Sequence, residues 1–408
     1  MCRPPASAEA TVRGKIDLAD IVRAHGSEYR RTHILALAPR RAMRAIEACR
    51  TAALGGRKEV CDACGAVRIT YNSCRNRHCP KCQTLAKQRW VESRRAELLP
   101  VGYFHLVFTL PHELNSLAQG NPRVIYELLF GAMADTLTSF ADDPRHLGGQ
   151  LGVTAILHTW GQNLSQHIHL HCVVTGGALA RGGSRWIPAN PTFLFPVRAL
   201  SKIFRAKFLE GLRRAFDGGE LVFSGTAQTL AAPDAFDPWL SQLRRKAWVV
   251  YAKRPFAGPQ QVLEYLGRYT HRVAISNERI LGLEHGIVRF RWKDYAHGTT
   301  IKVMELKAGE FLRRFLLHIV PDGFVRIRHF GILANRHRKE KLDRCRRLLG
   351  QAPLPESTAT ESVPAMMLRL TGIDIEIRPF CHRGRMHVTD LLPTIRVVPA
   401  TQKGWNSS

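Results

Sequence analysis

The sequence has 408 residues, of which 45% are hydrophobic, and its 60 Lys and Arg against 33 Asp and Glu give a formal net charge of +27. Such a chain can bury one large core or two to three smaller ones, and its positive charge indicates a polyanionic partner, most often nucleic acid. No window approaches the roughly 20 apolar residues of a transmembrane helix, and residues 1–10 lack the apolar core of a signal peptide. We therefore expect a soluble, cytoplasmic protein with no membrane partner.

The first hundred residues are predicted to form two helices, a cysteine-rich module and a third helix. Residues 16–31 and 39–54 have helical periodicity, and two glycines that follow act as a stop signal. Residues 87–100 are predicted to form a basic helix that Pro100 ends. A domain boundary is expected near residue 100.

Five of the ten cysteines fall between residues 61 and 82, which favours metal binding in a reducing compartment over disulfides. Four of them form two Cys-x2-Cys knuckles separated by 14 residues: Cys61, Cys64, Cys79 and Cys82. Four thiolates on two tight turns predict a closed, tetrahedral Zn²⁺ site of the ribbon type. Cys74 and His78 lie between the knuckles, and either could replace a knuckle cysteine. The Arg and Lys residues around the module are consistent with DNA contact or with a solvated face.

A strand pair is predicted at residues 153–161 and 167–179, after a buried strand at 103–111 and a helix over 121–140. The second strand of the pair has histidines at alternate positions, so His167, His169 and His171 share one face while apolar residues occupy the other. One alternative is an exposed strand edge that tolerates histidines. A row of three imidazoles favours metal ligation instead.

The remaining elements complete an α+β pattern, because strands and helices interleave without βαβ regularity. Glycine pairs at 176–177 and 182–183 are predicted as turns, and 198–216 as a basic helix. A strand and a helix are then expected before an antiparallel meander, and residues 351–364 are expected to be a disordered linker. The strand and helix cover 246–256 and 260–272, and the meander strands cover 273–276, 286–292 and 299–306.

Two tyrosines in the 260–272 helix, Tyr265 and Tyr269, are four residues apart and share a face, with Arg268 and Arg272 in a second row beside them. Such pairs usually belong to a core. A tyrosine hydroxyl, with a pKa near ~10, needs help to attack a phosphodiester. A histidine-bound divalent ion and guanidinium groups could give that help by neutralising and orienting the phosphate.

Six stretches together resemble the two-tyrosine HUH transposases of rolling-circle insertion sequences, the IS91 type. They are AIEACRTAALGG, CDACG with SCRNRHCPKCQ, FHLVFTLPHEL, LHTWGQNLSQHIHLHCVVTGGAL, YLGRYTHRVAISNERI and RHFGILANRHRKEKL. The resemblance implies an N-terminal helical zinc ribbon followed by an HUH nuclease domain, an antiparallel sheet flanked by helices with a ferredoxin/RRM-like palm. The expected ranges are 1–100, 101–320 and, for a basic segment with a partly disordered tail, 321–408.

The family motifs fall on His169-Leu170-His171 and on the pair Tyr265 and Tyr269. The resemblance implies Mg²⁺- or Mn²⁺-dependent cleavage of single-stranded DNA, with a 5′-phosphotyrosine, a free 3′-OH and no ATP. No nucleotide cofactor is expected. The chain also lacks a helicase P-loop, which argues against an initiator or relaxase with a fused motor. For the third metal ligand we prefer His158 on the preceding strand to His167, because alternate residues on one strand are roughly 6 to 7 Å apart.

The C-terminal region departs from relatives at one knuckle. Arg378 stands where they have a first cysteine and only Cys381 remains, which argues against a second zinc site. Residues 326–347 hold nine Arg or Lys against two acids and are expected to follow a DNA backbone, although a solvated helix face is the usual alternative. The predicted function is a nucleoid-associated transposase. A replication initiator or relaxase, or a zinc-ribbon DNA-binding protein without catalysis, are the alternatives.

Overall fold

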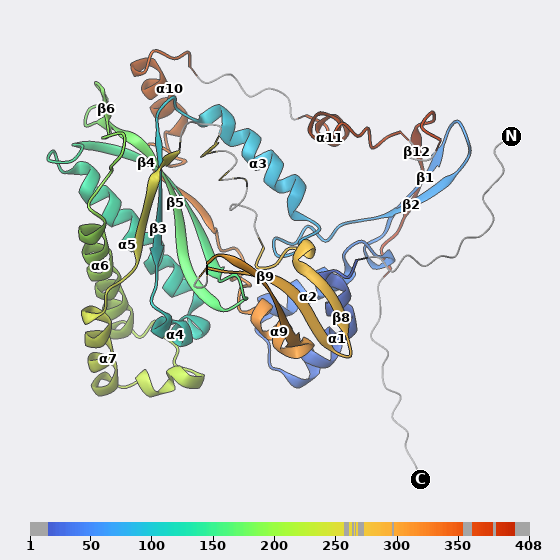
Figure 1. Ribbon diagram of the computed structural model, residues 1–408, viewed down its shortest axis with the longest axis horizontal. Coiled ribbons are helices and arrows are strands. Elements are labelled where there is room, and N and C mark those ends of the chain that lie inside the picture. The colour runs from blue at the N-terminus through green and yellow to red at the C-terminus, as the bar shows by residue number, and fades with distance from the viewer. Residues whose placement is uncertain are drawn as a thin grey trace, which may run out of the picture.

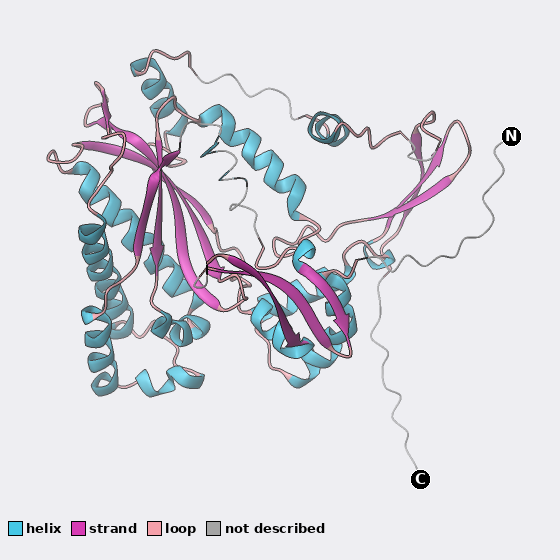
Figure 2. Ribbon diagram, in the orientation of Figure 1, coloured by secondary structure: helices cyan, strands magenta, loops and turns pink. Residues whose placement is uncertain are grey.

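The fold mixes helices with antiparallel sheets, so the predicted α+β class is confirmed (Figures 1 and 2). The coordinates are a computed structural model. They describe residues 15–256, 261–262, 265, 267, 273–295, 298–353, 361–377 and 381–395. Half of the predicted linker, residues 354–360, lies outside the described residues, and residues 363–364 belong to a helix.

A six-stranded antiparallel sheet forms the centre of the molecule, in the order β11-β4-β5-β3-β7, with β6 paired to β5. The predicted strands at 103–111, 153–161 and 167–179 are confirmed as β3, β4 and β5, which are adjacent in the sheet. The strands are β3 (Tyr103–Thr109), β4 (Gly149–Trp160), β5 (Gln166–Ala180), β6 (Trp186–Pro188), β7 (Val250–Phe256) and β11 (Ile327–Gly331).

Helices cover one face of this sheet (Figure 1). The alternation along β5 places Ile168, Leu170 and Cys172 on that face, where they join the largest apolar core. The predicted helices at 121–140 and 198–216 are confirmed as α5 and α6. The helical elements around this core are η2 (His112–Leu114), α4 (Asn115–Gly120), α5 (Pro122–Asp142), α6 (Val197–Asp217), η3 (Gly225–Leu230) and α7 (Pro233–Arg245).

Helix α5 has the length and apolar composition that a membrane-crossing helix needs, contrary to the expectation that no segment of the chain approaches it. A buried helix of a protein core has the same composition. Its inward residues, among them Ile125, Leu129 and Met133, are fully buried against the central sheet and α6. The packing therefore accounts for this composition without a membrane.

The N-terminal helices pack in a second core, away from the central sheet. Helix α1 begins with a capping box: the Asp17 carboxylate accepts from the backbone N–H of Ala19 and Asp20, and the Asp20 carboxylate accepts from that of Asp17. The two predicted helices are confirmed, but the second ends at Ala48 because Cys49 turns to an extended backbone. These elements are α1 (Leu18–Thr32), α2 (Leu37–Ala48) and η1 (Ala52–Leu54).

The second core is completed by the predicted meander, which forms a three-stranded sheet in the order β10-β9-β8. Phe290 and Phe311 from this region pack with Leu18 and Met43 of the N-terminal helices. Residues 273–276 were predicted as the first strand of the meander, but they lie just before the sheet. The first strand of the sheet is β8, which pairs with β9. The elements are η4 (Asn277–Arg279), β8 (Ile280–Glu284), β9 (Ile287–Asp294), β10 (Thr300–Lys307) and α9 (Ala308–Leu316).

A second three-stranded sheet, in the order β12-β1-β2, joins the two ends of the described chain. It extends away from the central sheet, and α3 runs between the two (Figure 1). The predicted basic helix at 87–100 is confirmed as α3. These elements are β1 (Gly56–Cys61), β2 (Val67–Tyr71), α3 (Gln83–Glu97) and β12 (Met386–Leu392).

The chain after residue 320 contributes to several parts of the fold. Strand β11 pairs with β4 in the central sheet, and β12 pairs with β1. Two helices, α10 (Arg338–Leu348) and α11 (Val363–Thr371), lie between these strands in the sequence. The chain after residue 320 therefore contributes strands to both the central sheet and the β12-β1-β2 sheet.

The glycine pair at 176–177, predicted as a turn, lies inside β5 instead. A Cβ at Gly176 would stand 2.6 Å from the Gly102 carbonyl oxygen, and one at Gly177 would stand 2.6 Å from Trp186 Nε1. Glycine is needed here because two chain segments approach the strand closely. The pair Gly182 and Gly183 does form the turn before β6.

Gly331 fixes the end of β11, and its replacement by alanine is expected to be costly. Its φ is +65°, and an added Cβ would stand 1.8 Å from the Leu151 carbonyl oxygen. Gly323 has a similar φ of +71° with open space around it. Gly331→Ala is therefore expected to lower the free energy of unfolding by about 3 kcal/mol, and Gly323→Ala by about 1 kcal/mol. Urea unfolding of both variants measures the difference, and equal losses would contradict the steric argument.

Candidate active site

The face of the central sheet opposite its largest apolar core holds a cluster of three histidines from two adjacent strands. His169 and His171 are on β5, and His158 on β4 is the register partner of His169. One ring nitrogen from each of the three lies within 4.8 Å of the others. His158 and His169 are buried. The structure thus brings together the two motif histidines and the preferred third one.

The hydrogen bond at Nδ1 of His169 fixes which of its nitrogens carries the lone pair that a cation could accept. Its Nδ1 lies 2.8 Å from the backbone carbonyl oxygen of His167. Because a carbonyl only accepts, Nδ1 carries the proton, and Nε2 keeps its lone pair. Such a bond from the far nitrogen to a carbonyl is the usual support for a metal-binding histidine. The His167 imidazole itself is exposed, and it is outside the cluster.

The spacing of the imidazoles fits a single cation. Nε2 of His169 and Nε2 of His171 are 3.1 Å apart. Two metal–nitrogen bonds of about 2.1 Å, at angles between 90° and the tetrahedral value, separate their nitrogens by about 3.0 to 3.4 Å. The same distance is also that of an N–H···N hydrogen bond. The geometry therefore accommodates a metal ion.

Tyr265 lies directly against this cluster, with its side chain buried. Its hydroxyl is 3.0 Å from Nδ1 of His171 and also hydrogen-bonds Nε2 of His105 on β3. Its ring packs with Ile156 and Val173 of the sheet, which holds the hydroxyl beside the histidines. The predicted Tyr269, Arg268 and Arg272 lie outside the described residues.

His105 is a site residue that the sequence analysis missed. Its Nε2 is 3.1 Å from Nδ1 of His171, so it touches both the tyrosine and the histidine cluster. Burial, together with the charge of Lys253, lowers the pKa of His105 to about 4, so its ring is neutral near pH 7. The sequence feature that could have indicated this residue is a histidine inside the otherwise apolar strand predicted at 103–111.

The two predicted cysteine knuckles do not meet. Cys79 and Cys82 cluster with Cys49 and Cys74, whereas Cys61 and Cys64 cluster with Cys381. The β1–β2 hairpin causes the separation: Gly56 pairs with Tyr71 at its base, and Val60 pairs with Val67 near its tip. A strand of this length places Cys61 about 17–20 Å from the base. The expected set of Cys61, Cys64, Cys79 and Cys82 is thus divided between two places, and the described His78 is in neither.

The cluster at the hairpin base has the dimensions of a tetrahedral thiolate site. Its sulfurs are 3.5 Å apart for Cys49 and Cys82, 3.6 Å for Cys74 and Cys82, and 3.7 Å for Cys79 and Cys49. Two Zn–S bonds of about 2.3 Å at the tetrahedral angle separate their sulfurs by about 3.8 Å. Burial, followed by the neighbouring thiols, raises the pKa of Cys49 to about 11. A bound cation would offset this cost, because it stabilises thiolates.

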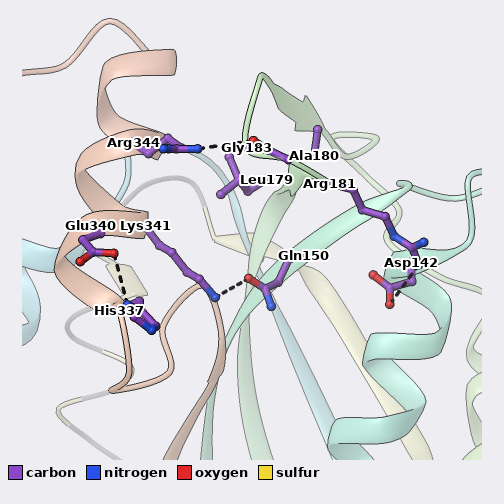
Figure 3. Close-up of a pocket in the computed structure, with 11 residues that line it drawn as sticks. Asp142, Gln150, Leu179, Ala180, Arg181, Gly183, His337, Glu340, Lys341 and Arg344 are labelled. Carbon is purple, nitrogen blue, oxygen red and sulfur yellow. Dashed lines mark hydrogen bonds and ion pairs between the residues drawn. The ribbon is translucent and has the colours of Figure 1, made fainter.

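A pocket of about 490 Å³ is lined by Gln150 of β4 and Leu179 and Ala180 of β5, at the ends of these strands that lie far along the chain from the histidines (Figure 3). Helix α10 forms one wall, where Lys341 Nζ donates to Gln150 Oε1 at 2.9 Å and Arg344 donates to the Gly182 carbonyl. Leu342 and Cys345 of the same helix are buried. The predicted basic segment thus lies against the sheet, with several cations facing outward.

Comparison with known proteins gives the class of this chain, a DNA-processing enzyme, and identifies it as a transposase. A family model described as "Putative transposase" matches residues 152–341, and one described as "Transposase zinc-binding domain" matches residues 21–110. The first match includes the three histidines and Tyr265. The second includes every cysteine of the two clusters except Cys381. No solved structure matches.

Two curated relatives give the family. The chain is 52% identical over 395 residues to "Putative transposase y4qJ" of Sinorhizobium fredii (strain NBRC 101917 / NGR234), across 96% of this chain and 98% of that protein. It is 31% identical over 300 residues to "Transposase for insertion sequence element IS801" of Pseudomonas savastanoi pv. phaseolicola, across 71% and 68%. The chain belongs to the IS91-type family of insertion-sequence transposases.

Proposed function

We propose that this transposase nicks and rejoins single-stranded DNA at insertion-sequence ends through a 5′-phosphotyrosine intermediate on Tyr265. The observation that carries the proposal is the contact between the Tyr265 hydroxyl and His171, within the three-histidine cluster. A nucleophile beside a cation site is what phosphodiester cleavage by tyrosine requires. The name of the relative from Pseudomonas supports the insertion sequence as the substrate.

His158, His169 and His171 are proposed to hold one Mg²⁺ or Mn²⁺ ion, with neutral imidazole nitrogens as ligands. When bound, the ion neutralises and orients the scissile phosphate as a Lewis acid and template. His167 supports the site through its backbone carbonyl, which fixes the His169 ring. His105 positions the Tyr265 hydroxyl by a hydrogen bond. Arg268 and Arg272 are proposed to clamp the remaining phosphate oxygens.

The chemical step exchanges one phosphoester bond for another. The Tyr265 oxygen attacks phosphorus, and the bond from phosphorus to the 3′ oxygen of the preceding nucleotide breaks. The phenol gives its proton to water, and the departing 3′ oxygen takes one from water to become a free 3′-OH. A 3′-OH reverses the step during rejoining, so no ATP is needed. Tyr269 is proposed to hold a second DNA end in the same way.

The N-terminal module is proposed to be a DNA-binding domain with a structural Zn²⁺ ion on Cys49, Cys74, Cys79 and Cys82. Its helices pack on the β8–β10 sheet and α9 in one core. The outward cations of α10 are proposed to contact the DNA backbone. Because its proposed partner is DNA, we propose that the protein is cytoplasmic and associated with the nucleoid, and that it uses no nucleotide cofactor.

The polarity of the DNA link tests the proposal. Purified protein is incubated with a single-stranded oligonucleotide that carries the host element's end, labelled at its 5′ or its 3′ terminus, with and without Mn²⁺. On a denaturing gel we expect the 3′-labelled strand to shift with the protein and the 5′-labelled strand to be released as a shorter fragment. Both products should require Mn²⁺.

Two results would contradict the proposal. Attachment of the 5′-labelled fragment would show the opposite linkage. Binding of the correct DNA in native gels, without any covalent product in Mn²⁺ or Mg²⁺, would favour a zinc-dependent DNA binder that does no chemistry.

A further inference from the structure

The tip of the β1–β2 hairpin faces a turn from the opposite end of the chain. Strand β1 ends at Cys61, which pairs with Met386 at the start of β12. The turn from Cys381 to Gly384 directly precedes this pairing. Two short turns that each carry cysteine are therefore held face to face, although Cys61 and Cys381 are 320 positions apart in the sequence.

The packing between the two turns is close and specific. A Cβ at Gly384 would stand 2.3 Å from the Cys61 sulfur and 2.7 Å from Ala63 Cβ, so only glycine allows this approach. The backbone N–H of Asp62 donates to the Arg385 carbonyl at 3.1 Å. In return, the Arg385 N–H donates to the Asp62 carboxylate at 2.8 Å. The approach of the cysteines is thus built by the backbone of both turns.

The sulfur spacing is that of a metal site and not that of a disulfide. The Cys61 and Cys381 sulfurs are 3.7 Å apart, and those of Cys61, Cys64 and Cys381 all lie within 4.8 Å of one another. A disulfide needs about 2.05 Å, whereas two thiolates on one tetrahedral Zn²⁺ are about 3.8 Å apart. The 3.7 Å spacing also occurs in the cluster at the hairpin base.

Backbone donors around these sulfurs match thiolate ligands. The backbone N–H groups of Arg383 and Gly384 lower the pKa of the Cys381 thiol. The N–H of Ala66 also favours a thiolate at Cys64, where burial and the neighbouring thiols act in the opposite direction and raise the pKa. Such bonds stabilise negative charge on sulfur, which a metal ligand must carry. His382 adopts φ +52°, which bends the chain tightly after Cys381. The single remaining C-terminal cysteine is therefore placed like one half of a knuckle.

We propose that Cys61, Cys64 and Cys381 bind a second Zn²⁺ ion that fastens the C-terminal strand to the hairpin tip, with water as the fourth ligand. Soft thiolates select zinc over Mg²⁺ or Mn²⁺. Among the described residues the cluster supplies three ligands, and Cys64 is exposed, so solvent reaches the remaining position. The site is independent of the nicking chemistry and uses a ligand beyond the matched zinc-binding domain.

Zinc content measured by atomic spectroscopy tests the site without any activity assay. Relative to the wild-type chain, Cys381→Ser is expected to lose one zinc equivalent, Cys79→Ser one, and the double variant two. Cys345→Ala is the matched control, because Cys345 is a buried cysteine outside both clusters, and it should keep the wild-type content. A Cys381→Ser protein with wild-type zinc content would overturn the proposal.

Alkylation of the unmodified chain gives a second measurement that no variant can confound. With TCEP and zinc present, the exposed Cys64 should resist iodoacetamide, and chelation should raise its labelling rate by at least about tenfold, because a bound thiolate is blocked. Peptide mass spectrometry assigns the label. Equal labelling before and after chelation, or a Cys61–Cys381 disulfide recovered from the native protein without TCEP, would refute a zinc site.

Discussion

Replacing Tyr265 with phenylalanine is expected to reduce covalent DNA linkage by at least about 1000-fold, because the variant loses the nucleophilic oxygen. The ring packs with Ile156 and Val173 in an apolar cluster, which phenylalanine can fill. The free energy of unfolding and the zinc content should therefore stay close to wild type. Initial rates of the protein–DNA band on denaturing gels, at saturating Mn²⁺, measure the effect.

Tyr251→Phe is the matched control for this variant. Tyr251 is on β7 opposite Val107, on the same face of the sheet as the histidines, and is exposed. It should link DNA at a rate within about twofold of wild type, as expected for a surface change away from the reacting atoms. If Tyr265→Phe kept its linkage and Tyr269→Phe lost it, the nucleophile would have been assigned to the wrong tyrosine.

The histidine site shows which site residues can be predicted from the local sequence pattern and which cannot. Alternation along one strand places His169 and His171 on the same face, and this requires no tertiary information. Whether His158 lies beside His169 depends on the register of β4 with β5. The apolar alternation of a strand shows which residues share a face, but it does not show which residue of the neighbouring strand lies opposite each of them. His105 was missed because it comes from β3, and nothing in the sequence says that β3 lies between β5 and β7.

The cysteines show where a prediction from local sequence spacing fails. The spacing within each Cys-x2-Cys knuckle predicts a metal ligand pair, but the partner of each pair depends on where the hairpin carries it. A ribbon would bring the two knuckles together, whereas β1 and β2 hold Cys61 and Cys64 away from the hairpin base. Cys49 follows a helix and Cys381 precedes the last strand, so no local spacing connects either one to its cluster.

The meander gives a third case, in which the elements are predicted and their packing is not. The alternation in 286–292 and 299–306 predicts the strands that become β9 and β10. Their apolar faces could cover any core. In the fold they pack on α1 and α2, which come from the opposite end of the sequence. Phe290 is buried in the same core cluster as Met43, which lies more than 200 positions earlier in the sequence.

His158 and His167 can be separated experimentally as candidates for the third metal ligand. His158→Asn is expected to lower the linkage rate at limiting Mn²⁺ by at least about 100-fold, because it removes one of three ligand nitrogens. His167→Asn should stay within about threefold of wild type. His167 is exposed, and its contribution to the site is the backbone carbonyl that accepts from His169, which the substitution retains.

Mn²⁺ titration followed by electron paramagnetic resonance distinguishes a lost ligand from a damaged fold. We expect weaker Mn²⁺ binding for His158→Asn, little change for His167→Asn and wild-type binding for Tyr265→Phe. His158 is buried, so thermal melting must show that its variant is folded. Because excess cation shifts the equilibrium toward the bound state, raising Mn²⁺ should recover part of the His158→Asn activity. A larger loss of Mn²⁺ affinity in His167→Asn than in His158→Asn would reverse the assignment.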